Sequence, residues 1–416
     1  MMELSLGFGL KPQKLEVPDN NIMDILEPNK VEVEKTGIDE VIRSLNNPIG
    51  TGRLNEIVKK GEKVAIITSD ITRPVPSYKI LPPILNELYE IGVKKEDITI
   101  VFALGSHRHQ TKEEKIKLVG ERIYKEVRCI DSDAEDCVKM GTTGGGTPVD
   151  IFRPVAEADR RICVGNIEFH YFAGYSGGAK AIMPGVSTPC AIQANHSKMM
   201  LENARAGKLD GNPVREDINE AALYCHIDFI VNVVLNVKKE IIYSAAGDYI
   251  KAHREGSRFL DKIYKKRLKE KADIVIVSQG GAPKDLNIYQ TQKALDNAKY
   301  AVKNGGIIIL VGCCSEGFGN KTFEKWMTEA ESPNELITRI KRDFRLGGHK
   351  AAAIALVLKK AKIYLVSDME PDMVEDIFMV PYASVQQAYD DAINELGGNA
   401  KVLIMPYGGS TLPVIE

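Results

Sequence analysis

The chain has 416 residues, of which 44% are hydrophobic and 27% are charged. This is the composition of a globular protein, and it excludes a disordered or fibrous chain. At roughly 150 residues per domain, the length predicts two or three domains. The 55 basic residues nearly balance the 57 acidic ones, and the net charge of -2 gives no sign of nucleic-acid or anionic-membrane binding.

The sequence favours a cytoplasmic protein. Its seven cysteines are an odd number without a C-x-x-C spacing, which argues against a disulfide framework and a thiolate zinc site. No apolar run reaches the length of a membrane-spanning helix. The first residues lack the basic and apolar segments of a secretory signal. We therefore expect a reducing compartment and no membrane partner.

Short runs of apolar and β-branched residues predict buried parallel strands in both halves of the chain. They are residues 63–68, 97–103, 161–164, 273–277, 306–311, 362–366 and 401–405. A helical pattern lies between the first two, with Pro82 and Pro83 in its first turn and Gly92 at its end. Another pattern runs from Ala294 and closes at Gly305. This alternation predicts an α/β fold with mainly parallel sheets.

The same patterns predict the domain organisation. We expect an N-terminal α/β domain over residues 1–248 and a C-terminal α/β domain over 272–416. A charged segment with helical spacing, residues 249–271, would connect them as a helix. The run 141–148 (GTTGGGTP) is typical of a hairpin tip. We expect the active site in the cleft between the two domains.

Polar side chains gather directly after three predicted strands of the first half. Ligands of open parallel sheets bind beyond the carboxyl ends of the strands, so these side chains would share one edge. They are Asp70, Thr72 and Arg73, then His107, then His170 and Lys180. Each has an ordinary alternative, since Arg73 beside Asp70 also suits a local ion pair, and a lone histidine is more often a surface residue. Their coincidence at one edge favours a site.

Three further features carry weaker signals. The glycine-rich segment containing Tyr175, Ser176, Gly177 and Gly178 suits an anion-binding nest for a phosphate-bearing ligand, although it also suits a tight turn. Its spacing matches neither a P-loop nor a dinucleotide fingerprint. His196 lacks a nearby second histidine, so spacing alone does not favour a metal ligand.

Gln290 and Lys293 begin a predicted helix in the second half. Residues three apart share a helix face, and a carboxylate is stabilised at a helix N-terminus. A solvated first turn is the equally simple alternative.

Taken together, several segments resemble the nickel-pincer lactate racemase family over nearly the whole chain. They are SDITRPVP (69–76), LGSHRH (104–109), GNIEFHYFAGYSGGAKAIMPGVS (165–187), ANHSKM (194–199) and GGAPKDLNIYQTQKAL (280–295). The third segment is long and unusual in composition, which makes the resemblance specific.

The resemblance implies a cofactor and the residues that hold it. Enzymes of this family carry a nickel-pincer nucleotide, pyridinium-3-thioamide-5-thiocarboxylic acid mononucleotide with Ni, made by cofactor-synthesis proteins. By resemblance, Lys180 is linked covalently through the thioamide and His196 is the remaining nickel ligand. The residues that would surround the ribose and phosphate are Asp70, Thr72, Tyr175, Ser176, Gly177 and Gly178.

The resemblance also implies the reaction, racemisation of lactate through transient hydride transfer to the cofactor. His107 and His170 would be the acid/base pair, since a pKa near 6.5 lets histidine give and take protons near neutrality. Arg73, Gln290 and Lys293 would bind the substrate's carboxylate and oxygen. Alternatives are a racemase or epimerase of another 2-hydroxy acid, a phosphate-binding metal-dependent hydrolase or isomerase, and a non-catalytic carrier of the cofactor.

Overall fold

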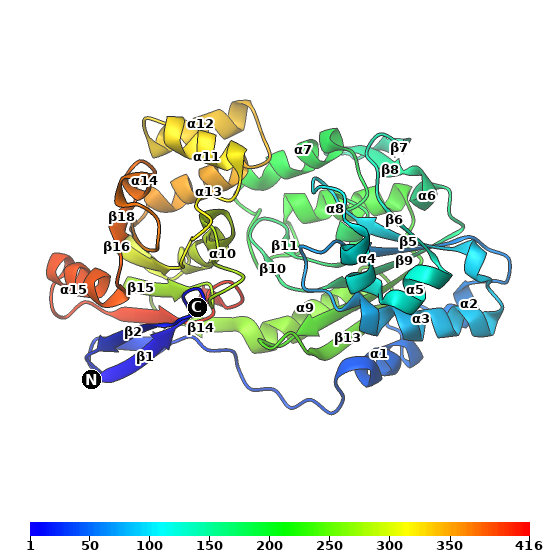
Figure 1. Cartoon of the computed structure of the whole chain (residues 1–416), viewed down its shortest axis with the longest axis horizontal. Coiled ribbons are helices and arrows are strands. Elements are labelled where there is room, and N and C mark those ends of the chain that lie inside the picture. The colour runs from blue at the N-terminus through cyan, green and yellow to red at the C-terminus, as the bar shows by residue number, and fades with distance from the viewer. The chain divides into compact units, whose positions relative to one another are not determined.

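Mainly parallel β-sheets form the cores of two units in the structure, a computed structural model that describes residues 1–416 (Figure 1). The middle unit is Val31–Lys262, and the terminal unit combines Met1–Lys30 with Ile263–Glu416. This confirms the prediction of an α/β fold with mainly parallel sheets. No helix has the length and apolar character that crossing a membrane requires.

The middle unit is built around a six-stranded sheet in which all neighbours are parallel except β12 and β13. In spatial order its strands are β13 (Ile241–Gly247), β12 (Phe229–Leu235), β9 (Arg160–Asn166), β4 (Val64–Ser69), β5 (Ile98–Ala103) and β6 (Arg128–Asp131). The predicted strands at 63–68, 97–103 and 161–164 are thus confirmed as β4, β5 and β9.

Helices and two small antiparallel pairs complete this unit. The helices are α1 (Gly37–Asn46), α2 (Leu54–Ile57), α3 (Ser77–Ile91), α4 (Lys112–Val119), α5 (Glu121–Glu126), α6 (Arg153–Ala156), α7 (Pro189–Ser197), α8 (Pro213–Tyr224) and α9 (Lys251–Tyr264). The pairs are β7 (Cys137–Thr142) with β8 (Pro148–Phe152), which confirms the predicted hairpin, and β10 (Phe169–His170) with β11 (Gly174–Tyr175).

Helix α3 begins one turn earlier than the sequence predicted. Pro82 and Pro83 lie inside it and not in its first turn. The early start has a local cause, because the buried hydroxyl of Ser77 hydrogen bonds to Thr68 of β4 at 2.7 Å and fixes the first turn against the sheet. The predicted end is confirmed, since Gly92 caps the helix with a φ of 92° that favours glycine.

The terminal unit contains a second six-stranded sheet, and this one is parallel throughout. In spatial order its strands are β18 (Val380–Tyr382), β17 (Lys362–Val366), β16 (Val302–Val311), β15 (Ala272–Ser278), β19 (Val402–Met405) and β3 (Ile22–Ile25). The helices are α10 (Ile288–Ala298), α11 (Lys321–Glu329), α12 (Pro333–Arg342), α13 (Gly348–Leu358), α14 (Pro371–Glu375) and α15 (Val385–Leu396).

Pairing between distant segments changes three predicted boundaries. Residues 1–30 group with the terminal unit and not with residues 31–248, because β3 pairs with β19 and the β1 (Met2–Leu6) and β2 (Gln13–Val17) hairpin joins the same core. The helix predicted over 249–271 ends at Tyr264, since β14 (Lys265–Leu268) pairs with β20 (Leu412–Ile415). Helix α10 ends at Ala298 and not at Gly305, because β16 begins at Val302.

The contribution of the first 30 residues to the terminal core can be measured. Leu15 is fully buried among residues of this core, so Leu15→Ala should lower the free energy of unfolding by about 3 kcal/mol. The only tryptophan, Trp326, is 1% exposed and lies in the terminal unit, so its fluorescence during urea unfolding reports on this unit. Leu10→Ala is the matched control, because Leu10 is 94% exposed. Equal unfolding curves for the two variants would contradict the assignment.

Candidate active site

The middle sheet has a topological switch point at β4. The chain passes from β4 to β5 on one side and later returns to β9 on the other side. Loops that leave the carboxyl ends of strands at such a reversal diverge, and ligands bind between them. Here these loops begin at Asp70, Leu104 and Ile167. They carry the polar side chains that the sequence placed at this edge.

His107 is held by a buried carboxylate. Its Nδ1 donates to Oδ2 of Asp70 at 2.6 Å, and Thr72 donates its hydroxyl to the other oxygen, Oδ1, at 2.8 Å. The side chain of Asp70 is 3% exposed and that of His107 is 39% exposed. Since the carboxylate accepts the Nδ1 proton, Nε2 of the neutral ring carries the lone pair. His107 is therefore arranged as a proton acceptor with an accessible ring.

These contacts bear on two predicted roles. Asp70 and Thr72 were expected near the cofactor's ribose and phosphate, and that remains a prediction, whereas the hydrogen bonds observed here serve His107. The alternative of an Asp70–Arg73 ion pair is not what the structure contains. Arg73 follows Asp70 in the same turn, and its side chain is exposed and forms no ion pair.

His170 shows the opposite arrangement of its ring nitrogens. Its Nδ1 accepts a hydrogen bond from the backbone N–H of Ala173 at 3.2 Å, which leaves the proton of the neutral ring on Nε2. Burial is the main cause that lowers the pKa of His170 well below 6.5, and the positive charge of Arg73 lowers it further. Near neutral pH this ring is uncharged and presents an N–H donor.

Lys180 occupies the 3₁₀ turn Gly178–Ala181, directly after the glycine-rich loop. Burial is the largest cause that lowers the pKa of Lys180 well below 10.5, and the nearby charges of Arg215 and Arg73 lower it further. An amine with a lowered pKa retains its lone pair near neutrality and can act as a nucleophile. This is the property that a covalent attachment site requires.

His196 lies near the end of α7 and is oriented by its neighbour Asn195. The Asn195 amide donates to the carbonyl of Val214 at 3.2 Å and to Oδ2 of Asp217 at 2.7 Å, so its oxygen faces Nδ1 of His196 at 3.1 Å. That oxygen can only accept, and the His196 proton is therefore on Nδ1. Nε2 then carries the lone pair that binding a metal requires. Metal-binding histidines commonly donate their other ring N–H to a protein acceptor, as His196 does to the Asn195 oxygen.

Asp217 ties this arrangement to the β7–β8 hairpin. Its carboxylate accepts from the hydroxyls of Thr143 at 2.5 Å and Thr147 at 2.6 Å, and it pairs with Lys198 at 3.2 Å. Four donors to one buried carboxylate explain why the pKa of Asp217 is lowered although burial alone would raise it. No three or more His, Cys, Asp or Glu side chains form a cluster that could hold a metal ion.

The glycine-rich loop is fixed from inside the unit by three side chains, Asn212, Arg215 and His253. Asn212 and Arg215 belong to the start of α8, and His253 belongs to α9. Each donates to one or more carbonyl groups of the loop. The accepting carbonyls are those of Phe172, Ala173, Tyr175, Ser176 and Gly177. The loop conformation is thus determined by buried donors.

The loop amides are also engaged, which weakens the expected anion nest. The N–H of Tyr175 donates to Ala173, that of Ser176 to Glu168, and that of Gly178 to Oδ1 of Asn232 at 2.6 Å. The Tyr175 hydroxyl donates to Asp261 at 2.7 Å. Cofactor binding by this loop remains a prediction, while the contacts seen hold the loop itself.

Gln290 and Lys293 lie in the first turns of α10 in the terminal unit, and both are half-buried. Asn287 caps this helix by accepting from the Gln290 N–H at 3.1 Å. A joint action of these residues with the histidines of the middle unit remains a prediction. On the same helix, Tyr289 receives a cation–π contact from Lys350 at 3.9 Å from its ring centre.

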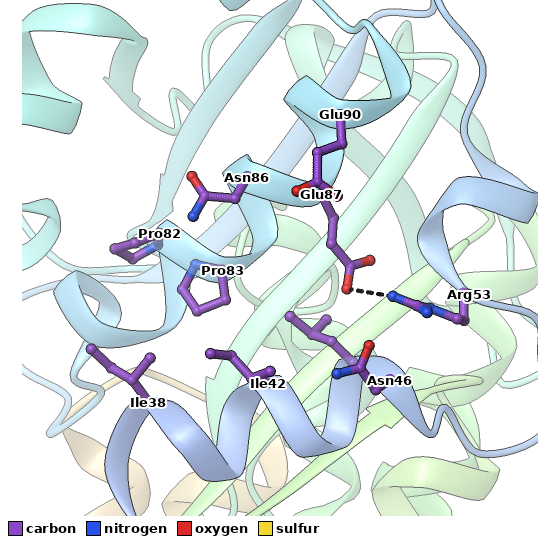
Figure 2. A pocket seen from close by; sticks show the side chains of 10 residues that line it. Ile38, Ile42, Asn46, Arg53, Pro82, Pro83, Asn86, Glu87 and Glu90 are labelled. Carbon is purple, nitrogen blue, oxygen red and sulfur yellow. Dashed lines mark hydrogen bonds and ion pairs between the residues drawn. The ribbon is translucent and has the colours of Figure 1, made fainter.

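A cavity of about 300 Å³ in the middle unit is separate from these residues (Figure 2). It lies between α1 and α3, with Ile38 and Ile42 on one side and Pro82 and Pro83 on the other, and Arg53 pairs with Glu87 at its edge at 3.4 Å. None of the predicted site residues lines it. The candidate active site is instead the loop cluster beyond β4, β5 and β9.

The sequence missed three residues of this cluster, Arg215, Asn195 and Asp217. Arg215 contacts residues 38–42 positions earlier in the chain, and no local pattern signals such a contact. Asp217 likewise gathers donors from distant segments. For Asn195 a signal existed, since it directly precedes His196 within a quoted segment.

Comparisons with known proteins give one consistent result. The lactate racemase N-terminal domain matches residues 8–207, and the lactate racemase C-terminal domain matches residues 268–413. The lactate racemase of Thermoanaerobacterium thermosaccharolyticum is 34% identical over 99% of both chains. That of Lactiplantibacillus plantarum is 35% identical over 98% of this chain and 99% of its own.

Solved structures agree with the sequence matches. The lactate racemase apoprotein from Thermoanaerobacterium thermosaccharolyticum superposes with a TM-score of 0.93 at 33% identity, covering 99% of this chain and all of that one. A Thermotoga maritima protein, at 19% identity and a TM-score of 0.71, covers 93% of this chain and all of its own, and it shows the shared fold only. The chain therefore belongs to the lactate racemase family, and with it to the isomerases.

Proposed function

We propose that this racemase interconverts D- and L-lactate with a lysine-tethered nickel-pincer nucleotide, and that His107 and His170 exchange the hydroxyl proton of the substrate. The observation that carries this proposal is the pair of histidines whose ring nitrogens are held in opposite states. Asp70 leaves a lone pair on Nε2 of His107, whereas the Ala173 amide leaves a proton on Nε2 of His170. The loop cluster beyond β4, β5 and β9 would then offer a base and a hydrogen-bond donor to the two enantiomers.

The residues of the middle unit fit the cofactor. Lys180 supplies an amine with a lowered pKa for the thioamide link, and His196 supplies an Nε2 lone pair for nickel. His196 would be the protein's ligand to the metal, since imidazole is a suitable ligand for nickel. The bound cofactor would supply the acceptor for the hydride that leaves the substrate's carbinol carbon. Proteins that synthesise the nucleotide would load it.

Binding of the substrate's carboxylate is assigned to Arg73. Its exposed guanidinium forms no ion pair in the structure, and guanidinium binds a carboxylate through two parallel hydrogen bonds. Gln290 and Lys293 would hold the carboxylate and hydroxyl from the terminal unit. A carboxylate fixed at two points lets the carbinol carbon present either face while the rest of the substrate stays in place.

The two histidines then divide the proton transfers. His107 takes the hydroxyl proton of one enantiomer on Nε2, and the Asp70 carboxylate stabilises the imidazolium that forms. For the other enantiomer we assign the same role to His170, in the tautomer that carries its ring proton on Nδ1, so that Nε2 can accept the hydroxyl proton. Its lowered pKa means that any proton it accepts is given back readily. Each residue acts as base in one direction and as acid in the reverse direction.

The comparisons and the geometry leave the alternatives with less support. The glycine-rich loop that suggested a phosphate-binding hydrolase donates its amides to protein acceptors. The presence of both histidines and Arg73 goes beyond what a cofactor carrier needs. A larger 2-hydroxy acid is tested by the same assay as lactate.

Protein purified from its native cell should show a covalent adduct by intact mass, one nickel per adduct, and interconversion of D- and L-lactate. Activity with a larger acid and none with lactate would overturn the substrate assignment.

Lys180→Ala should abolish the covalent adduct and racemisation together, because no other amine would replace it. Intact mass spectrometry and a lactate assay measure the two effects on protein from the native host. Lys198→Ala is a useful control, since Lys198 also lies in the middle unit but is engaged with Asp217. A Lys180→Ala protein that still carries the adduct would contradict the attachment site.

Asp70→Asn should lower kcat/KM by about 100-fold, because the amide no longer fixes the His107 tautomer or stabilises its protonated form. The two enantiomers have equal free energy, so the loss must be the same in both directions. Adduct and nickel content should not change. Thr72→Val removes only the neighbouring hydroxyl and should cost less than about tenfold. Comparable losses in the two variants would show that Asp70 has no special role.

Asn195→Leu should reduce nickel per covalent adduct by about tenfold or more after gel filtration, because His196 loses the acceptor that orients it. The amount of adduct itself, measured by intact mass, should stay near that of the unchanged protein. Thr143→Val removes one donor to Asp217 but leaves the Asn195 contacts in place, so it should retain its nickel. Full nickel occupancy in Asn195→Leu would contradict the proposal that Asn195 orients His196 for nickel binding.

A further inference from the structure

The cavity between α1 and α3 has an apolar wall on each side. Ile38 and Ile42 point from α1 toward Pro82 and Pro83 of α3 (Figure 2). The two isoleucines lie four residues apart on one helix face, and they are 44% and 43% exposed. A volume of about 300 Å³ is at the small end of the range for ligand pockets. The cavity therefore has room and apolar surface for a small aliphatic group.

The charged side chains of the lining are Arg53, Glu87 and Glu90, so acids outnumber bases there. The one ion pair among them is incomplete. Nη2 of Arg53 donates to Oε1 of Glu87 at 3.4 Å, whereas Nε of Arg53 and Oε2 of Glu87 are buried without a hydrogen-bond partner. A carboxylate oxygen that is removed from water and receives no donor costs free energy.

Arg53 balances the charge of Glu87 only in part. The Glu87 side chain is 16% exposed and that of Arg53 is 42% exposed, so the acid lies deeper than its partner. Burial raises the pKa of Glu87, and Arg53 lowers it by less. The remaining polar side chains of the lining, Asn46 and Asn86, carry no charge. A second positive group that donates hydrogen bonds is what this cavity lacks.

We propose that the cavity binds a small primary alkylammonium compound, with the ammonium group on Glu87 and Glu90 and the alkyl chain between the apolar walls of α1 and α3. The site is separate from the loop cluster beyond β4, β5 and β9, and the inference does not rest on the proposed function.

The charge of the lining selects this class of ligand. An ammonium group has three donors and forms charge-assisted hydrogen bonds with carboxylates, which are stronger than bonds between neutral groups. An anionic ligand of the same length would meet an excess of carboxylates. A neutral ligand would fill the apolar space but leave the charge of Glu87 without its second partner.

Binding of n-pentylamine to the full-length protein can be measured by isothermal titration calorimetry at about pH 8, where this amine is protonated like a lysine side chain. We expect a Kd of about 1 mM, which is reasonable for a ligand of this size. Pentan-1-ol and pentanoate have the same chain length and should bind at least about tenfold more weakly. n-Butylamine should bind about fourfold more weakly, because it buries one methylene fewer.

Two charge variants should change the affinity in opposite directions. Glu87→Gln keeps the size of the side chain but removes its charge, so n-pentylamine should bind about tenfold more weakly. Arg53→Gln removes the guanidinium that competes for Oε1 of Glu87, so the affinity should rise by about threefold. The control is Glu96→Gln, since Glu96 is 70% exposed and lies outside the lining, and it should leave the affinity unchanged. Equal losses in Glu87→Gln and Arg53→Gln would mean that the pair only supports the fold.

Ile42→Ser tests the apolar wall independently of the charged pair. Ile42 is partly exposed, so the variant should fold, and the affinity for n-pentylamine should fall by about threefold. Leu223→Ser is the matched control, because Leu223 is 71% exposed on α8 and does not line the cavity.

Three further results would refute the inference. The first is no binding of n-pentylamine up to about 10 mM. The second is equal binding of n-pentylamine and pentan-1-ol, which would show an apolar space without charge recognition. The third is an unchanged affinity in Glu87→Gln, which would place the ammonium group elsewhere on the protein.

Discussion

The candidate site depends on the inward direction of the carbonyls in the glycine-rich loop. Five of them, from residues 172–177, accept hydrogen bonds from buried side chains of α8 and α9. Since Arg215 is among the donors, the loop forms around a positive charge that has no acid beside it. Such a charge costs several kcal/mol to bury, and it excludes further cations. Burial is the main cause that lowers the pKa values of Lys180, His170 and His253, and the charge of Arg215 lowers each of them further. The result is a region that favours anions and uncharged nucleophiles.

Fixed hydrogen-bond partners also explain why the rings of His107 and His170 differ in which nitrogen carries the proton. Two chemically identical rings acquire different properties because one faces the acceptor Asp70 and the other faces the donor N–H of Ala173. In many enzymes, two side chains of the same type act as acid and base because their surroundings give them different protonation states. A racemase needs this separation, because the hydroxyl groups of its two substrates point in different directions. In the proposed mechanism, the contacts of His107 and His170 in the middle unit would provide this difference.

Local sequence patterns predicted the strands and their polar loops, because buried parallel strands require unbroken apolar runs and the switch point lies where those runs end. Asp70, His107, His170 and Lys180 were found for this reason. Contacts between distant segments were not predictable. Arg215 on its helix looks like any charged residue, and the strand at 265–268 follows a helical pattern until its partner at 412–415 is known. Residues 22–25 join the terminal sheet through a pairing that spans almost the whole chain.

Asp217 shows how closely stability and chemistry are linked in this unit. Its carboxylate holds the β7–β8 hairpin through Thr143 and Thr147, and through Asn195 it also determines which nitrogen of His196 carries the proton. The sequence of residues 141–148 indicated only a turn, yet the threonines of that turn hold Asp217. Asp217 in turn orients Asn195, the hydrogen-bond partner of the proposed nickel ligand His196. Four donors share the buried carboxylate of Asp217, so no single hydroxyl is indispensable, whereas loss of the carboxylate would leave all four donors without their acceptor. The hairpin is therefore connected to the proposed nickel ligand through Asp217 and Asn195.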